Sequence, residues 1–184
     1  MHRYFSFVPS RLRRQQLPMS RRHDPKFVSQ LCRGESRAWS QLIDHWSPHL
    51  YSYVSYNAAS EADARLLLHT ILSEVIHTLI GARPLDNLTT LIFSIAYQHT
   101  LHYRRQNPGL LLPKLRPGQQ SAGETNADAQ SNFLQRLHQF TPEMQQLLLL
   151  RYLCGVTMPE LAQIVGQSEE LLTKVLYRSR AYFQ

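Results

Sequence analysis

The chain has 184 residues, of which 43% are hydrophobic, and a formal net charge of +7. A chain of this length and hydrophobicity buries a core, so disorder throughout is excluded, and it forms one ordinary domain or two small ones. No stretch approaches the roughly 20 apolar residues of a membrane-spanning helix, and the first 22 residues lack the apolar core of a secretory signal. We therefore expect a cytoplasmic protein without membrane insertion.

The positive charge is concentrated in a basic tail, residues 1–24. Residues 1–22 hold six arginines and no acidic residue, whereas residues 23–184 hold 14 basic and 13 acidic residues. Such a tail is either a nucleic-acid-binding arm or a solvated, disordered extension. Met19 is a second candidate translation start beside Met1, and a start there would remove most of this charge.

Residues 25–105 have apolar residues at intervals of three and four, which predicts successive α-helices. Pro, Gly and Asn interrupt the pattern, so breaks are expected at Ser47-Pro48, at residues 57–60 and at residues 81–84. Phe93 follows the buried side of this periodicity, and we expect it in the core.

Signals for helix ends occur in both halves of the chain. Ser60 precedes two acidic residues, a pattern that caps free amides and suits the positive end of a helix. Thr141 stands before a proline and a glutamate, and Thr157 has capping-box spacing to a glutamate three residues later. Gly166 is expected to end a helix in a positive-φ conformation, and Ser168 to cap the next one.

Between these halves, residues 106–131 are rich in proline, glycine and glutamine and have few bulky groups after position 115. This composition does not build a packed core and predicts a flexible linker. The expected fold is therefore all-α, with a helical domain at residues 25–105 and a second one at residues 132–184. Three helices in the last forty residues or so predict a helix-turn-helix arrangement in the second domain.

The last predicted helix has two different faces. Its apolar residues fall on one side, which leaves polar and basic residues available to solvent. We interpret this exposed face as a recognition helix for the DNA major groove. A helical hairpin with a solvated face is the alternative. The candidate DNA contacts are Thr173, Lys174, Tyr177, Arg178 and Arg180.

Cysteine and histidine spacing gives little support for metal chemistry. Cys32 and Cys154 lie far apart and are expected to be reduced core thiols. His99 and His102 are three residues apart on a predicted helix, but no third ligand accompanies them. We expect no cofactor, no metal site and no catalytic residue, and an enzyme that uses the histidines is the weakest hypothesis.

Longer motifs resemble one protein family. Residues 140–155 (FTPEMQQLLLLRYLCG) and 158–166 (MPELAQIVG) resemble the C-terminal promoter-binding domain of bacterial sigma factors of the extracytoplasmic-function group. Residues 31–51 and 91–105 resemble the other conserved domain of that family, in the same order. The resemblance covers residues 27–105 and 133–183. It implies a subunit that directs RNA polymerase to promoters, with promoter DNA, core RNA polymerase and an anti-sigma factor as partners.

The resemblance also assigns roles to residues of the first domain. The helix that melts and reads the downstream promoter element corresponds to residues 91–105, which implies DNA contacts from Tyr97, Gln98, Arg104 and Arg105. The segment that docks on the polymerase clamp corresponds to the helix after Ser60. Its contact positions are Leu66, Leu67, His69 and Thr70. Arg178 and Arg180 are the best candidates for the upstream element.

The docking segment departs from the family pattern. Leu66, His69 and Thr70 stand where the family usually has an acid, Gln and Glu, and such groups orient an interface as well as stabilise it. A second hypothesis therefore stays open. On that hypothesis the protein is a diverged, sigma-like DNA-binding regulator or interaction module that no longer binds core polymerase.

Overall fold

The computed structural model describes residues 25–82, 87–107, 136–137 and 139–180. These residues form an all-α protein without a strand, as the sequence predicts. The predicted tail at residues 1–24 lies outside the described residues, as does nearly all of the predicted linker at residues 106–131. The division into two domains stays a prediction. None of the described helices combines the length and apolarity needed to cross a bilayer.

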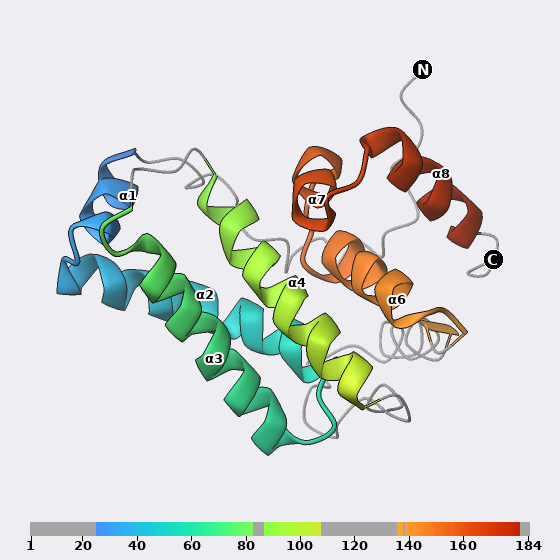
Figure 1. The fold of residues 1–184 in the computed structure, drawn as a ribbon, viewed down its shortest axis with the longest axis horizontal. Helices are drawn as coiled ribbons and strands as arrows, with labels where there is room; N and C mark the ends of the chain where they lie inside the picture. The colour runs from blue at the N-terminus through green and yellow to red at the C-terminus, as the bar shows by residue number, and fades with distance from the viewer. Residues whose placement is uncertain (1–24, 83–86, 108–135, 138, 181–184) are drawn as a thin grey trace, which may run out of the picture.

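The first half of the chain folds into four helices (Figure 1). They are α1 (Pro25–Cys32), α2 (Ser36–Ser55), α3 (Glu61–Leu79) and α4 (Leu88–Gln106). Helices α2, α3 and α4 pack against one another. Phe93 is fully buried among them, with its ring edge-on to Trp46 and Tyr53 at centroid distances of 5.7 and 6.2 Å. The prediction that Phe93 is a core residue is confirmed.

Helix α3 begins where the sequence predicts. The Ser60 hydroxyl accepts a hydrogen bond from the backbone N–H of Asp63 at 3.1 Å, and Glu61 and Asp63 lie in the first turn. One orphan amide is therefore satisfied and the acids lie at the positive end of the helix.

The predicted break at Ser47-Pro48 is wrong, because α2 runs through it from Ser36 to Ser55 with Pro48 inside the helix. A proline in a helix interior removes one backbone hydrogen bond and costs about 3 kcal/mol. Trp46 and Leu50, on either side of Pro48, are both buried in the core. Burial of the residues along this face offsets the cost, since most helix stability in proteins comes from packing.

The second half forms α6 (Pro142–Leu148), a π-helical turn η3 (Leu149–Leu153), α7 (Met158–Val165) and α8 (Glu169–Arg180). The predicted caps are present: Thr141 accepts from the N–H of Met144, and Thr157 forms a capping box with Glu160. The π-helical turn was not predicted. It brings the N–H of Cys154 to the carbonyl of Leu149 at 3.0 Å. Burial raises the pKa of the Cys154 thiol, whereas Cys32 is partly exposed.

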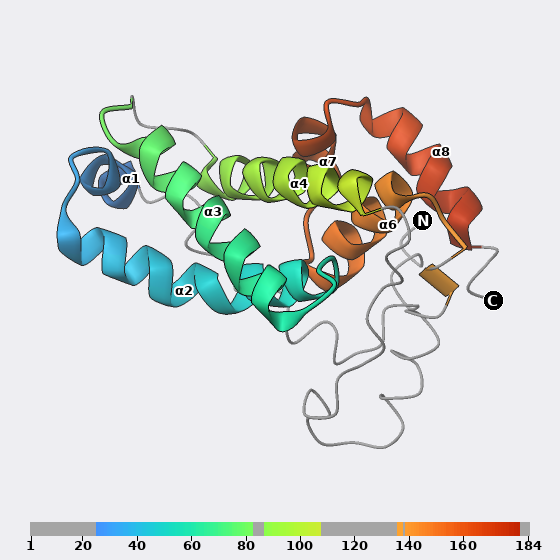
Figure 2. The ribbon, with the colours of Figure 1, turned by 60° about the horizontal axis from the view of Figure 1, so that its bottom comes forward.

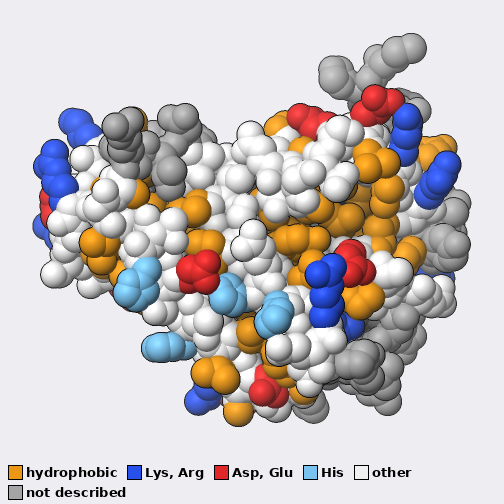
Figure 3. Space-filling model, viewed as in Figure 1, with side chains coloured by type: hydrophobic (Ala, Val, Ile, Leu, Met, Phe, Trp, Pro, Cys, Tyr) orange, Lys and Arg blue, Asp and Glu red, His pale blue; other side chains and the backbone are white. Residues whose placement is uncertain are grey.

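Helix α4 lies between the two sets of helices (Figures 1 and 2). It packs against α3 and α2 on one side and against α7 and α6 on the other. One buried apolar cluster therefore runs through both halves, from Leu31 in α1 to Leu176 in α8. Figure 3 shows hydrophobic side chains gathered where α4 meets the second set of helices.

We predict that Phe93→Ala lowers the free energy of unfolding by about 3–5 kcal/mol, because it removes a buried ring and leaves a cavity. Urea denaturation followed by circular dichroism measures the change. Leu171→Ala is the control, since Leu171 is 46% exposed and its truncation should cost less than about 1 kcal/mol. A Phe93→Ala loss as small as the control's would contradict the packing described here.

Candidate nucleic-acid interface

Helices α7 and α8 are joined by a tight turn at Gly166. Gly166 has φ = 69°, a left-handed conformation that glycine adopts without steric cost, and its N–H donates to the carbonyl of Ala162 at 2.9 Å. The Ser168 hydroxyl then accepts from the N–H of Leu171 at 3.3 Å and caps α8. Both sequence predictions are confirmed, and the two helices form a helix-turn-helix.

The two faces of α8 also follow the prediction. Leu172, Leu176 and Ser179 are buried against the rest of the molecule. The opposite face is open to solvent, and Tyr177 is 70% exposed. Four of the five candidate DNA contacts are exposed on this face. The side chain of the fifth, Arg180, is not among those that the structure describes. The four are Thr173, Lys174, Tyr177 and Arg178.

This exposed face carries both signs of charge, and Figure 3 shows acidic and basic side chains next to each other over α8. Glu169 and Glu170 lie in its first turn, where the helix dipole favours them. Lys174 donates to Glu170 at 2.6 Å across one turn. The pair is exposed and contributes little stability. Lys174 therefore has to exchange this carboxylate for a phosphate if it binds DNA. Among the residues that the structure describes, no acidic side chain pairs with Arg178.

Helix α4 does not bring its four candidate residues onto one open face. Gln98 and Arg105 are exposed, and Tyr97 is half-buried, with burial raising the pKa of its phenol. Arg104 is only 6% exposed and donates to Oε1 of Gln145 in α6 at 2.7 Å. Burial lowers the pKa of its guanidinium. In this arrangement Arg104 is therefore covered by α6 and is not available to DNA.

The candidate docking residues on α3 are also partly exposed and partly buried. Leu66, His69 and Thr70 are exposed, and Leu66 is 66% exposed. The Thr70 hydroxyl donates to the carbonyl of Leu66 at 2.9 Å. Leu67 points the other way into the core and is 9% exposed. A partner that binds this face therefore meets the three exposed residues and not Leu67.

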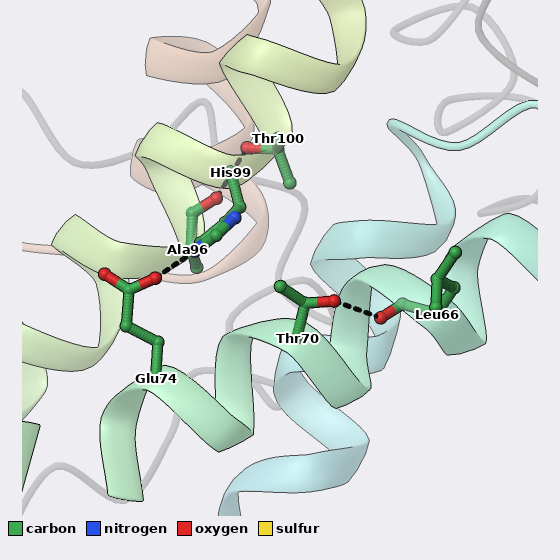
Figure 4. Close-up of polar contacts among 6 residues, drawn as sticks. All are labelled: Leu66, Thr70, Glu74, Ala96, His99 and Thr100. Atoms are coloured by element: carbon green, nitrogen blue, oxygen red, sulfur yellow. Dashed lines mark hydrogen bonds and ion pairs between the residues drawn. The ribbon is translucent and has the colours of Figure 1, made fainter. Parts of the chain in front are cut away.

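Glu74 lies one turn beyond Thr70 on α3 and was missed by the sequence reasoning. Its carboxylate is paired with the imidazole of His99 from α4, as Figure 4 shows. His102 instead lies 2.9 Å from the side-chain amide of Gln106. Within the described ranges no three His, Cys, Asp or Glu side chains form a group that could hold a metal ion. The four-residue spacing from Thr70 indicates that Glu74 lies on the same face of the helix. Its pairing with a residue of another helix could not be predicted from the sequence.

Comparison with solved structures identifies the fold. The structure of CnrH in complex with the cytosolic domain of CnrY matches this chain with a TM-score of 0.65 at 19% sequence identity, over 87% of this chain and 94% of that chain. CnrH is a sigma factor of the extracytoplasmic-function group. At this identity the likeness shows the fold alone. The chain therefore has the fold of such a sigma factor.

A second structure, the RsbN–BldN complex, matches with a TM-score of 0.37 at 20% identity, over 85% of this chain and 96% of that chain. That superposition is too loose to carry an argument. The sequence matches no protein-family model and no curated protein.

The exposed face of α8 predicts that Arg178→Ala weakens binding to duplex DNA and makes it less salt-dependent. Each neutralised phosphate contributes about 0.9 to the slope of log affinity against log salt, so the slope should fall by about that amount. Glu170→Gln should act in the opposite direction, since it releases Lys174 and removes a charge that repels phosphate. Fluorescence anisotropy over a salt series measures both changes.

Arg37→Ala is the matched control, because Arg37 is exposed on α2, remote in sequence from α8. It removes the same charge and should leave the salt slope unchanged. A slope that is the same in Arg178→Ala and in the unaltered protein would exclude the Arg178 contact.

Proposed function

We propose that this protein is a sigma factor of the extracytoplasmic-function group, a subunit that binds core RNA polymerase and directs it to promoters. The observation that carries the proposal is the helix-turn-helix of α7 and α8, with an exposed face that includes Lys174 and Arg178, in a chain with a sigma-factor fold. Such a subunit supplies recognition and leaves the chemistry to polymerase. Accordingly, we assign no catalytic residue.

In this proposal the two sets of helices contact different promoter elements. Helix α8 enters the major groove of the upstream element, where Arg178 and Lys174 bind phosphates or base edges. Helix α4 contacts the melted downstream element. Tyr97 offers a ring on which an unpaired base stacks, and Gln98 and Arg105 supply polar and charged contacts. Arg104 joins this surface when α6 moves away from it.

The exposed face of α3 is the proposed docking surface for the polymerase clamp. Leu66 is an exposed apolar side chain on this face, and the exposed residues His69 and Thr70 follow it one turn further along α3. An apolar anchor surrounded by polar groups is typical of protein interfaces. Glu74, held by His99, places a carboxylate on the next turn of this helix. It therefore supplies the negative charge that the positions of Leu66 and Thr70 lack.

An anti-sigma protein is a further proposed partner. CnrH, whose fold this chain shares, was solved in complex with the cytosolic domain of CnrY, an anti-sigma domain. A protein that covers α3 or α4 would block the surfaces proposed above for polymerase and for DNA.

The second candidate function is a sigma-like DNA-binding regulator that does not bind core polymerase. The apolar and neutral residues at Leu66, His69 and Thr70 favour it, since docking surfaces use charged groups for orientation and selectivity. It predicts that DNA is retained without any complex with polymerase.

The proposed function predicts that the purified protein binds core RNA polymerase and yields promoter-dependent transcripts. Leu66→Asp should weaken polymerase binding by about tenfold or more, because it buries a charge at the centre of the interface. A pull-down with core enzyme over a concentration series measures the affinity. Ile80→Asp is the matched control, since Ile80 is 54% exposed at the other end of α3.

Two results would contradict the proposal. One is no detectable complex with core enzyme, which together with DNA binding would favour the regulator. The other is an equal loss of affinity in Leu66→Asp and Ile80→Asp, which would show that the binding surface is not the one around Leu66.

A further inference from the structure

A buried polar cluster joins the two sets of helices. Gln146 of α6 is fully buried, and its side-chain amide donates to Oδ1 of Asn57 at 2.5 Å. Its carbonyl oxygen accepts from the hydroxyl of Tyr53 in α2. Thr100 of α4 lies 3.1 Å from that hydroxyl and 3.3 Å from the same carbonyl oxygen. We call Tyr53, Asn57, Thr100 and Gln146 the polar clasp.

The polar clasp fixes how α6 meets the first four helices. All four side chains are inaccessible to solvent, and burial raises the pKa of the Tyr53 phenol. A buried polar group that loses its partner costs more free energy than the hydrogen bond contributes, so Gln146 is held in one position. Apolar side chains alone would tolerate sliding of α6 along α4.

The same contact covers the last turns of α4. Beside the clasp, Gln145 accepts from the buried guanidinium of Arg104. At the edge, Arg105 donates to Glu143 at 3.1 Å in an exposed ion pair. The candidate DNA contacts of α8 are not covered in this way, since Lys174 and Arg178 remain exposed. The closed arrangement therefore presents one of the two proposed DNA surfaces and covers part of the other.

We propose that the polar clasp is a latch that keeps Arg104 covered by α6, so that the closed protein presents α8 to DNA while α4 becomes fully available only after α6 has separated. The statement that α4 and α8 bind DNA rests on the proposed function. The statement that the polar clasp keeps Arg104 covered does not.

The chemistry of the contact makes the latch reversible. Each member of the clasp is a neutral polar group that water hydrates well once the helices separate. Arg104 donates to the neutral side-chain oxygen of Gln145. A phosphate carries a formal negative charge and can accept two parallel hydrogen bonds from one guanidinium, whereas the side-chain oxygen of Gln145 is neutral. Phosphates of a melted strand therefore compete effectively for Arg104.

Two adjacent arginines test the latch directly. Phenylglyoxal modifies accessible guanidinium groups, and tandem mass spectrometry separates modification of Arg104 from that of Arg105. In the unaltered full-length protein, Arg104 should react at least about tenfold more slowly than Arg105, because Arg104 is 6% exposed and Arg105 is exposed. Equal rates would overturn the proposal.

Gln146→Leu removes the amide that donates to Oδ1 of Asn57 and the carbonyl oxygen that accepts from the Tyr53 hydroxyl, so both of these buried hydrogen bonds are lost in the closed state. The modification rate of Arg104 should rise by about tenfold, while that of Arg105 changes little. Gln163→Leu makes the same chemical change at an exposed position of α7 and should leave both rates unchanged. An unchanged Arg104 rate in Gln146→Leu would overturn the latch.

Loss of helical circular dichroism in Gln146→Leu would indicate unfolding in place of opening. Gln146→Asn then provides the test, since it keeps an amide but is too short to reach both partners, and the same rise at Arg104 is expected. Unchanged reactivity in folded Gln146→Asn would overturn the proposal. These experiments contain neither DNA nor polymerase, so their failure is distinct from failure of the proposed function.

Discussion

The hydrogen bonds of Gln146 are the constraint on which the arrangement of this molecule depends. They join Gln146 to two buried side chains, Tyr53 and Asn57, which lie 93 and 89 residues away in the sequence. Because an unsatisfied buried polar group costs about 1–3 kcal/mol, one position of α6 is strongly preferred. Helix α4 is thereby enclosed between two sets of helices, which explains why Arg104 and Arg105, adjacent in sequence, occupy opposite environments.

Features that depend on neighbouring residues could be predicted from the sequence. The caps at Ser60, Thr141 and Thr157 and the left-handed Gly166 each involve groups within a few residues of one another. The helical period also predicted the exposed face of α8, because burial of Leu172 and Leu176 leaves the opposite side to solvent. Most of the candidate upstream contact surface was therefore accessible from sequence.

Features that depend on distant packing could not be predicted. The sequence predicts a break at Pro48, yet α2 continues through it because its buried face packs into the core. The pairing of Glu74 with His99 and of Arg104 with Gln145 each joins two helices whose relative position no local pattern defines. Leu67 and Arg104 were assigned by position along a motif, and their burial follows from which side of the helix meets a neighbour. The resemblance thus indicates helices for the proposed docking and downstream surfaces, but the exposed and the buried residues of those helices could not be distinguished from the sequence.

We expect α6 to keep the free protein closed. Because α4 has to become fully available to contact the melted downstream element, we expect α6 to separate from α4 when core RNA polymerase binds. The most direct measurement is the pulsed-EPR distance between spin labels at Thr78 in α3 and Gln163 in α7, both exposed, with Cys32 replaced by serine. We expect one narrow distribution of short distances in the free protein and a longer distance after core RNA polymerase is added. A long, broad distribution in the free protein, or a short distance that persists in the polymerase complex, would contradict it.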